Sequence, residues 1–248
     1  MAYVIALAGK GGTGKTTIAA LLVRLLAARK LGPVLAVDAD PNANLGEVLG
    51  VPAQATVGDI LDAVSRDPDR IPAGMTKDRF VEYQVQTAVH EAQGFDLLTM
   101  GKPEGPGCYC YVNNILRAVI ERLVQDYAFV VIDNEAGLEH LSRRTTRRAD
   151  FLLVVAQPAA VALRAAQRIR DLAEQLQIRI GKTGLLLNAV QGTVDARGIS
   201  ETGLPLIGTV AYDQRLQRLS VKSASLAGLG GASKALVDLE KILDTITG

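Results

Sequence analysis

Several features are scarce in this sequence, and each scarcity excludes a class of protein. Only two of the 248 residues are cysteine, so no disulfide framework holds the chain and a reducing cytoplasm is expected. Lys and Arg number 27 against 26 Asp and Glu, and this balance of +1 gives no general field to hold nucleic acid or an anionic membrane. No apolar run is long enough to cross a bilayer, and the first residues lack the basic leader of a signal peptide.

The pattern of apolar residues predicts one α/β domain over residues 1–248, because no linker or internal repeat interrupts it. Buried strands are predicted at residues 4–8, 34–37, 95–100, 129–132, 151–156, 185–187 and 206–210. Helices are predicted at residues 15–29, 57–65, 112–126, 161–176 and 235–245. The spacing of apolar residues in 80–91 only slightly favours a helix, and loops are predicted at 67–74, 101–107 and 191–203. This alternation indicates a doubly wound, mostly parallel sheet with helices on both faces.

A phosphate-binding loop lies between the first strand and the first helix. It matches G-x-x-x-x-G-K-[ST] in full, at Gly9, Lys10, Gly11, Gly12, Thr13, Gly14, Lys15 and Thr16. Its glycines allow backbone N–H groups to turn toward phosphates, at the positive end of the helix. Lys15 is expected to reach the β- and γ-phosphates, Thr16 to ligate Mg²⁺ and Thr17 to donate to the α-phosphate.

Acidic residues follow two of the predicted strands. Asp38 and Asp40 end the second strand, where a carboxylate facing the loop can orient water or hold a Mg²⁺-bound water. Their alternative role is to cap a turn before Pro41. Asp133 ends an apolar strand in a Walker-B-like pattern and is expected to hold Mg²⁺ through water, while Gly137 lets the segment move when the γ-phosphate leaves.

Both cysteines, Cys108 and Cys110, lie in one Gly- and Pro-containing loop. One chain therefore offers two soft ligands, half of the tetrahedral set of a structural zinc site, and a two-fold dimer would supply four. The pattern predicts a metal site shared across a dimer interface, with free thiols as the alternative. Thiolates accept nickel, zinc or iron, so the pair does not name the metal.

Lys10, directly after the first glycine, makes the loop resemble the deviant Walker A motif. That family includes the nitrogenase iron protein, the septum-placement and chromosome-partition ATPases and the arsenite-pump ATPase. The resemblance implies that Lys10 crosses a dimer interface to the partner's nucleotide and that Asp40 positions the attacking water. It also implies that Asn188 reads adenine, since an amide can both donate and accept. No guanine-reading acidic motif is present, so ATP is favoured over GTP.

Three segments together resemble the carbon monoxide dehydrogenase accessory ATPases, the nickel-insertion proteins. They are the phosphate loop, Gly-Cys-Tyr-Cys at 107–110 and Asp-Asn-Glu-Ala-Gly-Leu-Glu-His-Leu at 133–141. The resemblance implies a homodimer that binds one metal through two C-x-C pairs. It further implies that ATP hydrolysis drives delivery of nickel to a client enzyme of the carbon monoxide dehydrogenase or acetyl-CoA synthase type.

Two other functions of the same superfamily remain as alternatives. An iron–sulfur carrier would normally draw cysteines from two separated segments, and residues 133–141 contain none, although a cluster on two C-x-C pairs stays possible. A positioning ATPase would need a basic C-terminal helix that carries aromatic residues, whereas residues 236–244 are net acidic and lack aromatics.

Three further features have more than one interpretation or none that is functional. His140 is interpreted as a hydrogen-bonded switch residue, with a transient metal ligand as the alternative, and His90 is interpreted as a surface residue. The cluster of Arg143, Arg144, Arg147 and Arg148 is interpreted as a solvated face, with a docking site for an acidic client as the alternative.

Overall fold

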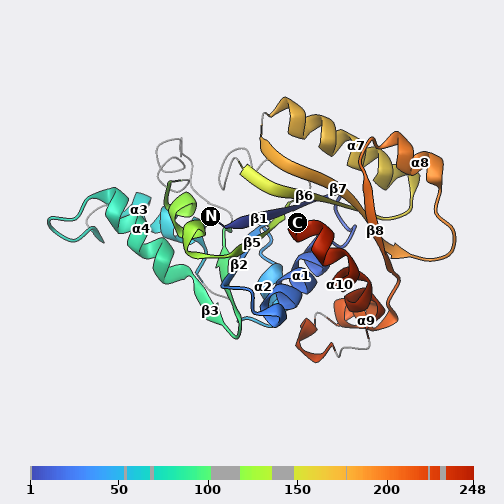
Figure 1. The fold of residues 1–248 in the computed structure, drawn as a ribbon. Helices are drawn as coiled ribbons and strands as arrows, with labels where there is room; N and C mark the ends of the chain where they lie inside the picture. The colour runs from blue at the N-terminus through green and yellow to red at the C-terminus, as the bar shows by residue number, and fades with distance from the viewer. Residues whose placement is uncertain are drawn as a thin grey trace.

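An eight-stranded sheet runs through the molecule in the order β3-β4-β2-β5-β1-β6-β7-β8 (Figure 1). All neighbouring strands are parallel except β3 and β4, which form an antiparallel pair at one edge. The computed structural model describes residues 2–52, 55–67, 70–101, 118–135, 148–176, 178–222, 224–229 and 233–248. This is the doubly wound α/β fold predicted from the sequence.

The strands and helices have the following bounds. The strands are β1 Tyr3–Ala8, β2 Val34–Ala39, β3 His90–Ala92, β4 Phe95–Thr99, β5 Phe129–Asn134, β6 Arg148–Ala156, β7 Arg179–Val190 and β8 Leu206–Ala211. The α-helices are α1 Lys15–Arg29, α2 Leu45–Leu49, α3 Val57–Arg66, α4 Lys77–Ala88, α7 Ala160–Gln175, α8 Ala196–Glu201, α9 Gln214–Val221 and α10 Lys234–Thr247. Residues 118–123 are also helical, and the short 3₁₀ helices are η2 Val124–Asp126 and η3 Leu226–Gly228.

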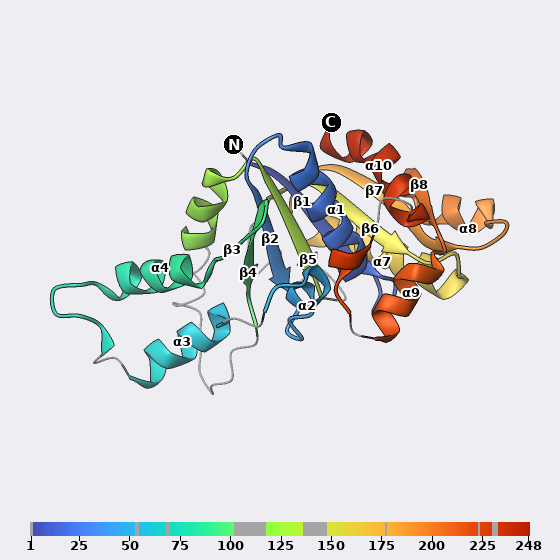
Figure 2. The same cartoon turned by 90° about the horizontal axis from the view of Figure 1, so that it is seen from below.

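Helices cover both faces of the sheet, and each face has its own hydrophobic core. One core joins α1, α2 and α10 to the sheet, while the other joins α3, α4, α7 and residues 119–124 to the opposite face (Figure 2). The central strands are therefore buried on both sides, which explains why they appear in the sequence as continuous apolar runs. The carboxyl ends of the seven parallel strands, all except β3, face the same edge of the sheet, where ligands of this fold class bind.

All seven predicted strands are confirmed, and β3 is an eighth that the sequence did not reveal. The loop predicted at 191–203 is wrong in part, because Asp195 caps the short helix α8 there. The helix predicted at 80–91 ends at Ala88, and His90 begins β3 as a half-buried residue rather than an exposed one. Residues 112–117 of another predicted helix lie outside the described residues. Among the described helices, none is both long and apolar enough to span a bilayer.

Candidate functional site

The phosphate loop turns from β1 into α1 at the carboxyl edge of the sheet. Lys10 anchors this turn through its carbonyl oxygen, which accepts from the Thr13 hydroxyl at 2.8 Å and from the Thr13 amide at 3.3 Å. Gly14 caps α1 in the left-handed region, with φ of +91°. A side chain there would be strained, and its Cβ would lie 2.3 Å from Asn188 Nδ2. The first amides of α1 are thus left available to an anion.

Lys15 begins α1 and is 7% exposed. Its ammonium lies 3.4 Å from the Lys10 carbonyl oxygen, a long and weak contact. Burial lowers the pKa of Lys15, and the Asp133 and Asp40 carboxylates oppose this effect. The ammonium therefore sits among acids at the loop, where a phosphate could replace its weak carbonyl contact.

Two buried acids lie side by side, since Asp38 of β2 pairs in register with Asp133 of β5. Burial raises the pKa of Asp38 to about 7, although the amides of Leu45 and Asp40 donate to it at 2.8 and 3.2 Å. These two bonds hold the turn between β2 and α2. The charge of Asp133 adds to the rise in the pKa of Asp38.

Asp133 is 1% exposed, and within the described part of the chain neither of its carboxylate oxygens has a hydrogen-bond partner. Burial raises the pKa of Asp133 to about 6, and the nearby Thr16 hydroxyl and Lys15 ammonium oppose the rise. The Thr16 hydroxyl thus faces the carboxylate without a hydrogen bond of ordinary geometry. Buried carboxylate oxygens without partners, beside a hydroxyl, are suited to Mg²⁺ or to its bound water.

Asp40 is half-buried on the turn after β2, and Asn42 holds its carboxylate. The Oδ1 atom accepts from the Asn42 amide at 2.9 Å and from the Asn42 side chain at 2.8 Å. Among the described residues, no donor reaches Oδ2 of Asp40. One carboxylate oxygen is therefore fixed, and the other is available to water.

Two amide side chains brace the loop from neighbouring strands. Asn188, near the end of β7, donates from Nδ2 to the Thr13 carbonyl oxygen at 2.9 Å. Gln157, after β6, donates to the Gly12 carbonyl oxygen at 3.3 Å, a contact that the sequence analysis missed. The position of Gln157 directly after a buried strand and before Pro158 was the available signal. In this arrangement Asn188 Nδ2 already donates a hydrogen bond to the phosphate loop.

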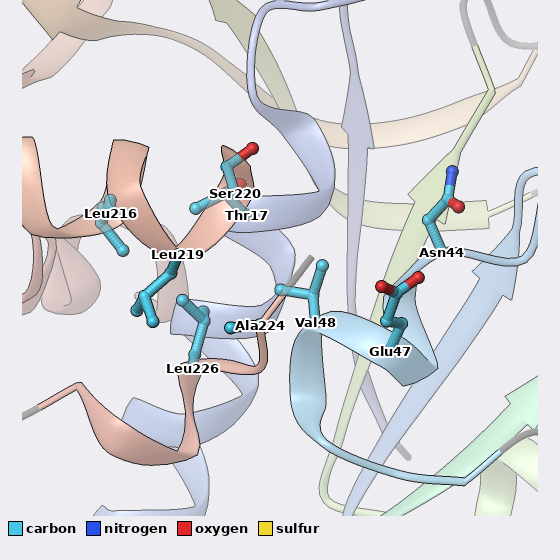
Figure 3. A pocket seen from close by; sticks show the side chains of 9 residues that line it. All are labelled: Thr17, Asn44, Glu47, Val48, Leu216, Leu219, Ser220, Ala224 and Leu226. Atoms are coloured by element: carbon cyan, nitrogen blue, oxygen red, sulfur yellow. The ribbon is translucent and has the colours of Figure 1, made fainter. Parts of the chain in front are cut away.

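A pocket of about 170 Å³ opens beside the loop, between α2 and α9 (Figure 3). Thr17 of α1 links it to the loop. Its other lining residues are Asn44, Glu47, Val48, Leu216, Leu219, Ser220, Ala224 and Leu226. Asn188 is not among them, so the predicted adenine contact and this pocket are separate features.

The structure brings together Lys15, Thr16, Asp40 and Asp133 at one edge of the sheet, whereas Cys108, Cys110, His140 and Gly137 lie outside the described residues. Of the predicted arginine cluster only Arg148 is described, and it pairs with Asp150 at 2.6 Å. Within the described ranges, no group of three or more His, Cys, Asp or Glu side chains could hold a metal ion. The chemistry that this site supports is binding of a nucleotide phosphate with Mg²⁺.

Comparisons with known proteins agree with a nucleotide-binding fold. The sequence model of the family described as CobQ/CobB/MinD/ParA nucleotide binding domain matches residues 4–226. An uncharacterised ATP-binding protein of Methanocaldococcus jannaschii is 41% identical over 98% of both chains. The carbon monoxide dehydrogenase accessory protein CooC of Rhodospirillum rubrum is 33% identical over 91% of this chain and 88% of its own. The fold is similar to that of Pyrococcus horikoshii MinD complexed with Mg-ADP, with a TM-score of 0.72 and 22% identity over 99% and 96% of the two chains.

Proposed function

Because the chain belongs to the CobQ/CobB/MinD/ParA family of nucleotide-binding domains, as an ATP-binding P-loop ATPase, we propose that it is an ATP-hydrolysing metallochaperone. Its cargo is a metal, nickel foremost, and its client is an enzyme of the carbon monoxide dehydrogenase or acetyl-CoA synthase type. One observation carries the proposal: the complete phosphate loop and the Cys108-Tyr109-Cys110 pair occur in one chain that is 33% identical to CooC over most of its length.

Hydrolysis would use the residues gathered at the loop. Lys15 and the loop amides hold the β- and γ-phosphates, and Thr17 donates to the α-phosphate. Thr16, Asp133 and Asp40 would hold Mg²⁺, the two carboxylates through water; the ion would neutralise charge developing on the transferred phosphate. Asp40 orients the attacking water with the carboxylate oxygen that Asn42 leaves free. Positioning and electrostatics supply most of the catalysis in this kind of reaction.

Metal binding would need two copies of the chain. Cys108 and Cys110 supply two thiolates, and a two-fold dimer brings four to one ion. Lys10 would reach the partner's nucleotide, so the nucleotide sites and the metal site are complete only in the dimer. ATP and metal then favour the same state, each raising the apparent affinity of the other by about 1–3 kcal/mol. Hydrolysis loosens the dimer and releases the metal to the client.

A positioning ATPase is the weaker alternative. Such a protein would expose an amphipathic helix to a membrane. Here Leu239, Ile242, Leu243 and Ile246 of α10 are buried, as members of the core that includes α1. The apolar face of this helix is therefore used within the fold.

Adenine recognition by Asn188 remains part of the proposal. The Asn188 side chain can still accept from the base through its carbonyl oxygen while its Nδ2 atom donates to the Thr13 carbonyl oxygen.

Metal titration with mass measurement tests the proposal. Nickel and zinc are added separately to anaerobic, reduced protein, with and without ATP and Mg²⁺, and bound metal and molecular mass are recorded. The expected result is one metal per two chains and formation of a dimer, both lost in the Cys108→Ser, Cys110→Ser double variant, which still binds ATP. Binding of one metal per monomer, or equal binding by the double variant, would contradict the shared site. A visible spectrum typical of an iron–sulfur cluster would favour the electron-carrier alternative.

A further inference from the structure

The middle of the phosphate loop, Gly11 and Gly12, is not held by packing. A Cβ placed on either residue would meet no atom of the described residues within 4 Å. Gly12 has φ of +80°, a backbone conformation that glycine adopts without the strain of a side chain. Because glycine rotates so freely, the direction of the N–H groups in this part of the loop depends on hydrogen bonds to the backbone.

Two neighbouring peptide groups of the loop are held by their carbonyl oxygens. Asn188 Nδ2 donates to the Thr13 carbonyl oxygen at 2.9 Å, and Gln157 Nε2 donates to the Gly12 carbonyl oxygen at 3.3 Å. The C=O and N–H of a planar trans peptide group point in opposite directions. The bond from Gln157 therefore turns the Thr13 N–H away from Gln157, and the bond from Asn188 turns the Gly14 N–H away from Asn188.

The Thr13 amide, on the peptide group that Gln157 holds, points into the loop. It donates to the Lys10 carbonyl oxygen at 3.3 Å, and the Lys15 ammonium lies 3.4 Å from the same oxygen. Both distances exceed the usual range for a hydrogen bond, so both donors are available to a stronger acceptor. Lys15 is the lysine of the phosphate-binding motif. Since the two donors converge on one point, a phosphate oxygen placed there would accept from both.

Gln157 is exposed, yet its backbone is held in place. Pro158 restricts the residue before it to an extended backbone, and the Ala159 amide donates to the Gln157 carbonyl oxygen at 2.7 Å. At the start of the loop, a Cβ on Gly9 would lie 2.3 Å from the Val155 carbonyl oxygen of β6. The end of β6 thus borders the loop at its first residue and at the residue that Gln157 holds.

We propose that Gln157 is a positioning residue for phosphate binding. By holding the Gly12 carbonyl oxygen, it directs the Thr13 amide toward a phosphate oxygen before the nucleotide arrives. A loop that already has its binding conformation loses less entropy when the ligand binds, so affinity rises. The inference rests on the ATP-binding part of the proposed function and does not depend on a metal cargo. Gln157 should act on the polyphosphate rather than on the base, and on affinity rather than on the chemical step.

Gln157→Met tests this role, because methionine keeps the length of the side chain and removes its hydrogen-bond donor without adding charge. Gln175→Met is the matched control, since Gln175 is the exposed last residue of α7, which leads from the carboxyl end of β6 toward the start of β7. The probes are ATP and inorganic tripolyphosphate, each with Mg²⁺, and steady-state hydrolysis gives kcat and KM. We expect Gln157→Met to weaken binding of both probes by the same factor, about three- to tenfold, with kcat within about twofold of the wild type. Gln175→Met should match the wild type throughout.

Four results would overturn the inference. Unchanged affinity for both probes would show that the bond to Gly12 does not prepare the loop. Weaker ATP binding with unchanged tripolyphosphate binding would assign Gln157 to the nucleoside. A lower kcat with unchanged affinity would assign it to the chemical step. Urea unfolding without nucleotide should give Gln157→Met and Gln175→Met the same midpoint, and a lower midpoint for Gln157→Met alone would assign the contact to fold stability. No metal enters these measurements, so failure of the metal titration and failure of this inference are distinguishable.

Discussion

At the scale of single residues, the Asp40 carboxylate is held by Asn42 through one oxygen only. If the other oxygen orients water, Asp40→Ala should keep ATP binding while hydrolysis falls by about 10²-fold or more. Asn42→Ala should slow hydrolysis by about three- to tenfold, because losing one orienting hydrogen-bond donor costs roughly 1 kcal/mol. Single-turnover hydrolysis and ATP affinity are the measurements.

Gln93→Ala is the control for this pair, since Gln93 is exposed in the turn between β3 and β4. Its hydrolysis rate should equal that of the wild type. Normal turnover in Asp40→Ala would remove Asp40 from the mechanism. Normal turnover in Asn42→Ala alone would remove only the positioning role of Asn42.

The raised pKa of Asp133 predicts that the free energy of unfolding depends on pH. Its pKa in the folded protein is about 6, above the ordinary 3.8, so the folded state binds this proton more tightly than the unfolded state. Protonation of Asp133 therefore stabilises the folded state at low pH, and this contribution is lost as pH rises through about 6. In nucleotide-free Asp133→Asn, the free energy of unfolding relative to wild type should therefore increase by about 1–2 kcal/mol between pH 5 and pH 8. Urea unfolding measures it, and a difference that does not vary with pH would contradict the shift.

At the scale of elements, Gly14 joins the phosphate loop to α1 and lies against β7. Gly14→Ala should lower the free energy of unfolding by about 1–2 kcal/mol through its left-handed backbone alone. Overlap of the new Cβ with Asn188 Nδ2 adds to this loss and displaces the brace on Thr13, so ATP binding should be lost as well.

Gly11→Ala is the matched control, because a Cβ on Gly11 would meet no atom of the described residues within 4 Å. Without nucleotide its stability should stay within about 0.5 kcal/mol of the wild type. Denaturant unfolding and ATP titration of both variants give the comparison. Equal stabilities would show that the loop relaxes around a side chain at Gly14.

The elements that were predictable are those whose burial leaves a long apolar pattern. The helix predicted at 15–29 is α1 residue for residue, since a complete motif begins it and its apolar residues pack on the sheet. α8 and α9 were not predicted, because six and eight residues carry too little periodicity and depend on the caps Asp195 and Asp213. β3 was missed because three residues, His90–Ala92, form a strand only through pairing with β4.

The candidate site was predictable where residue type and strand end coincide. Lys15, Thr16 and Asp40 follow buried strands and Asp133 lies near the end of one, and the parallel topology brings those ends together. The sequence could not show that Asp38 and Asp133 are register neighbours, because register depends on the whole sheet. Nor could it show that Asn188 bonds the Thr13 carbonyl, a contact between residues 175 positions apart.

At the scale of the whole molecule, the proposed dimer has its two copies meeting at the phosphate-loop edge, because Lys10 would have to reach the partner's nucleotide there. Lys10 lies there with an exposed side chain, and its ammonium has no hydrogen bond or ion pair to any described residue. Its carbonyl oxygen is meanwhile fixed by Thr13. The backbone is held while the charge is left free, which is the arrangement needed by a lysine that acts on a partner's nucleotide.

Complementation between two inactive variants tests this role of Lys10. Lys10→Ala should bind ATP nearly normally yet fail to hydrolyse it, and Lys15→Ala should lose binding and turnover together. In a mixed dimer, the Lys10→Ala subunit keeps an intact loop and receives Lys10 from its partner, so one of the two sites is complete. Random exchange makes half of the dimers mixed, and an equal mixture should recover about a quarter of wild-type hydrolysis. If native mass spectrometry shows mixed dimers but hydrolysis equals the sum of the two separate variants, Lys10 does not act across the interface.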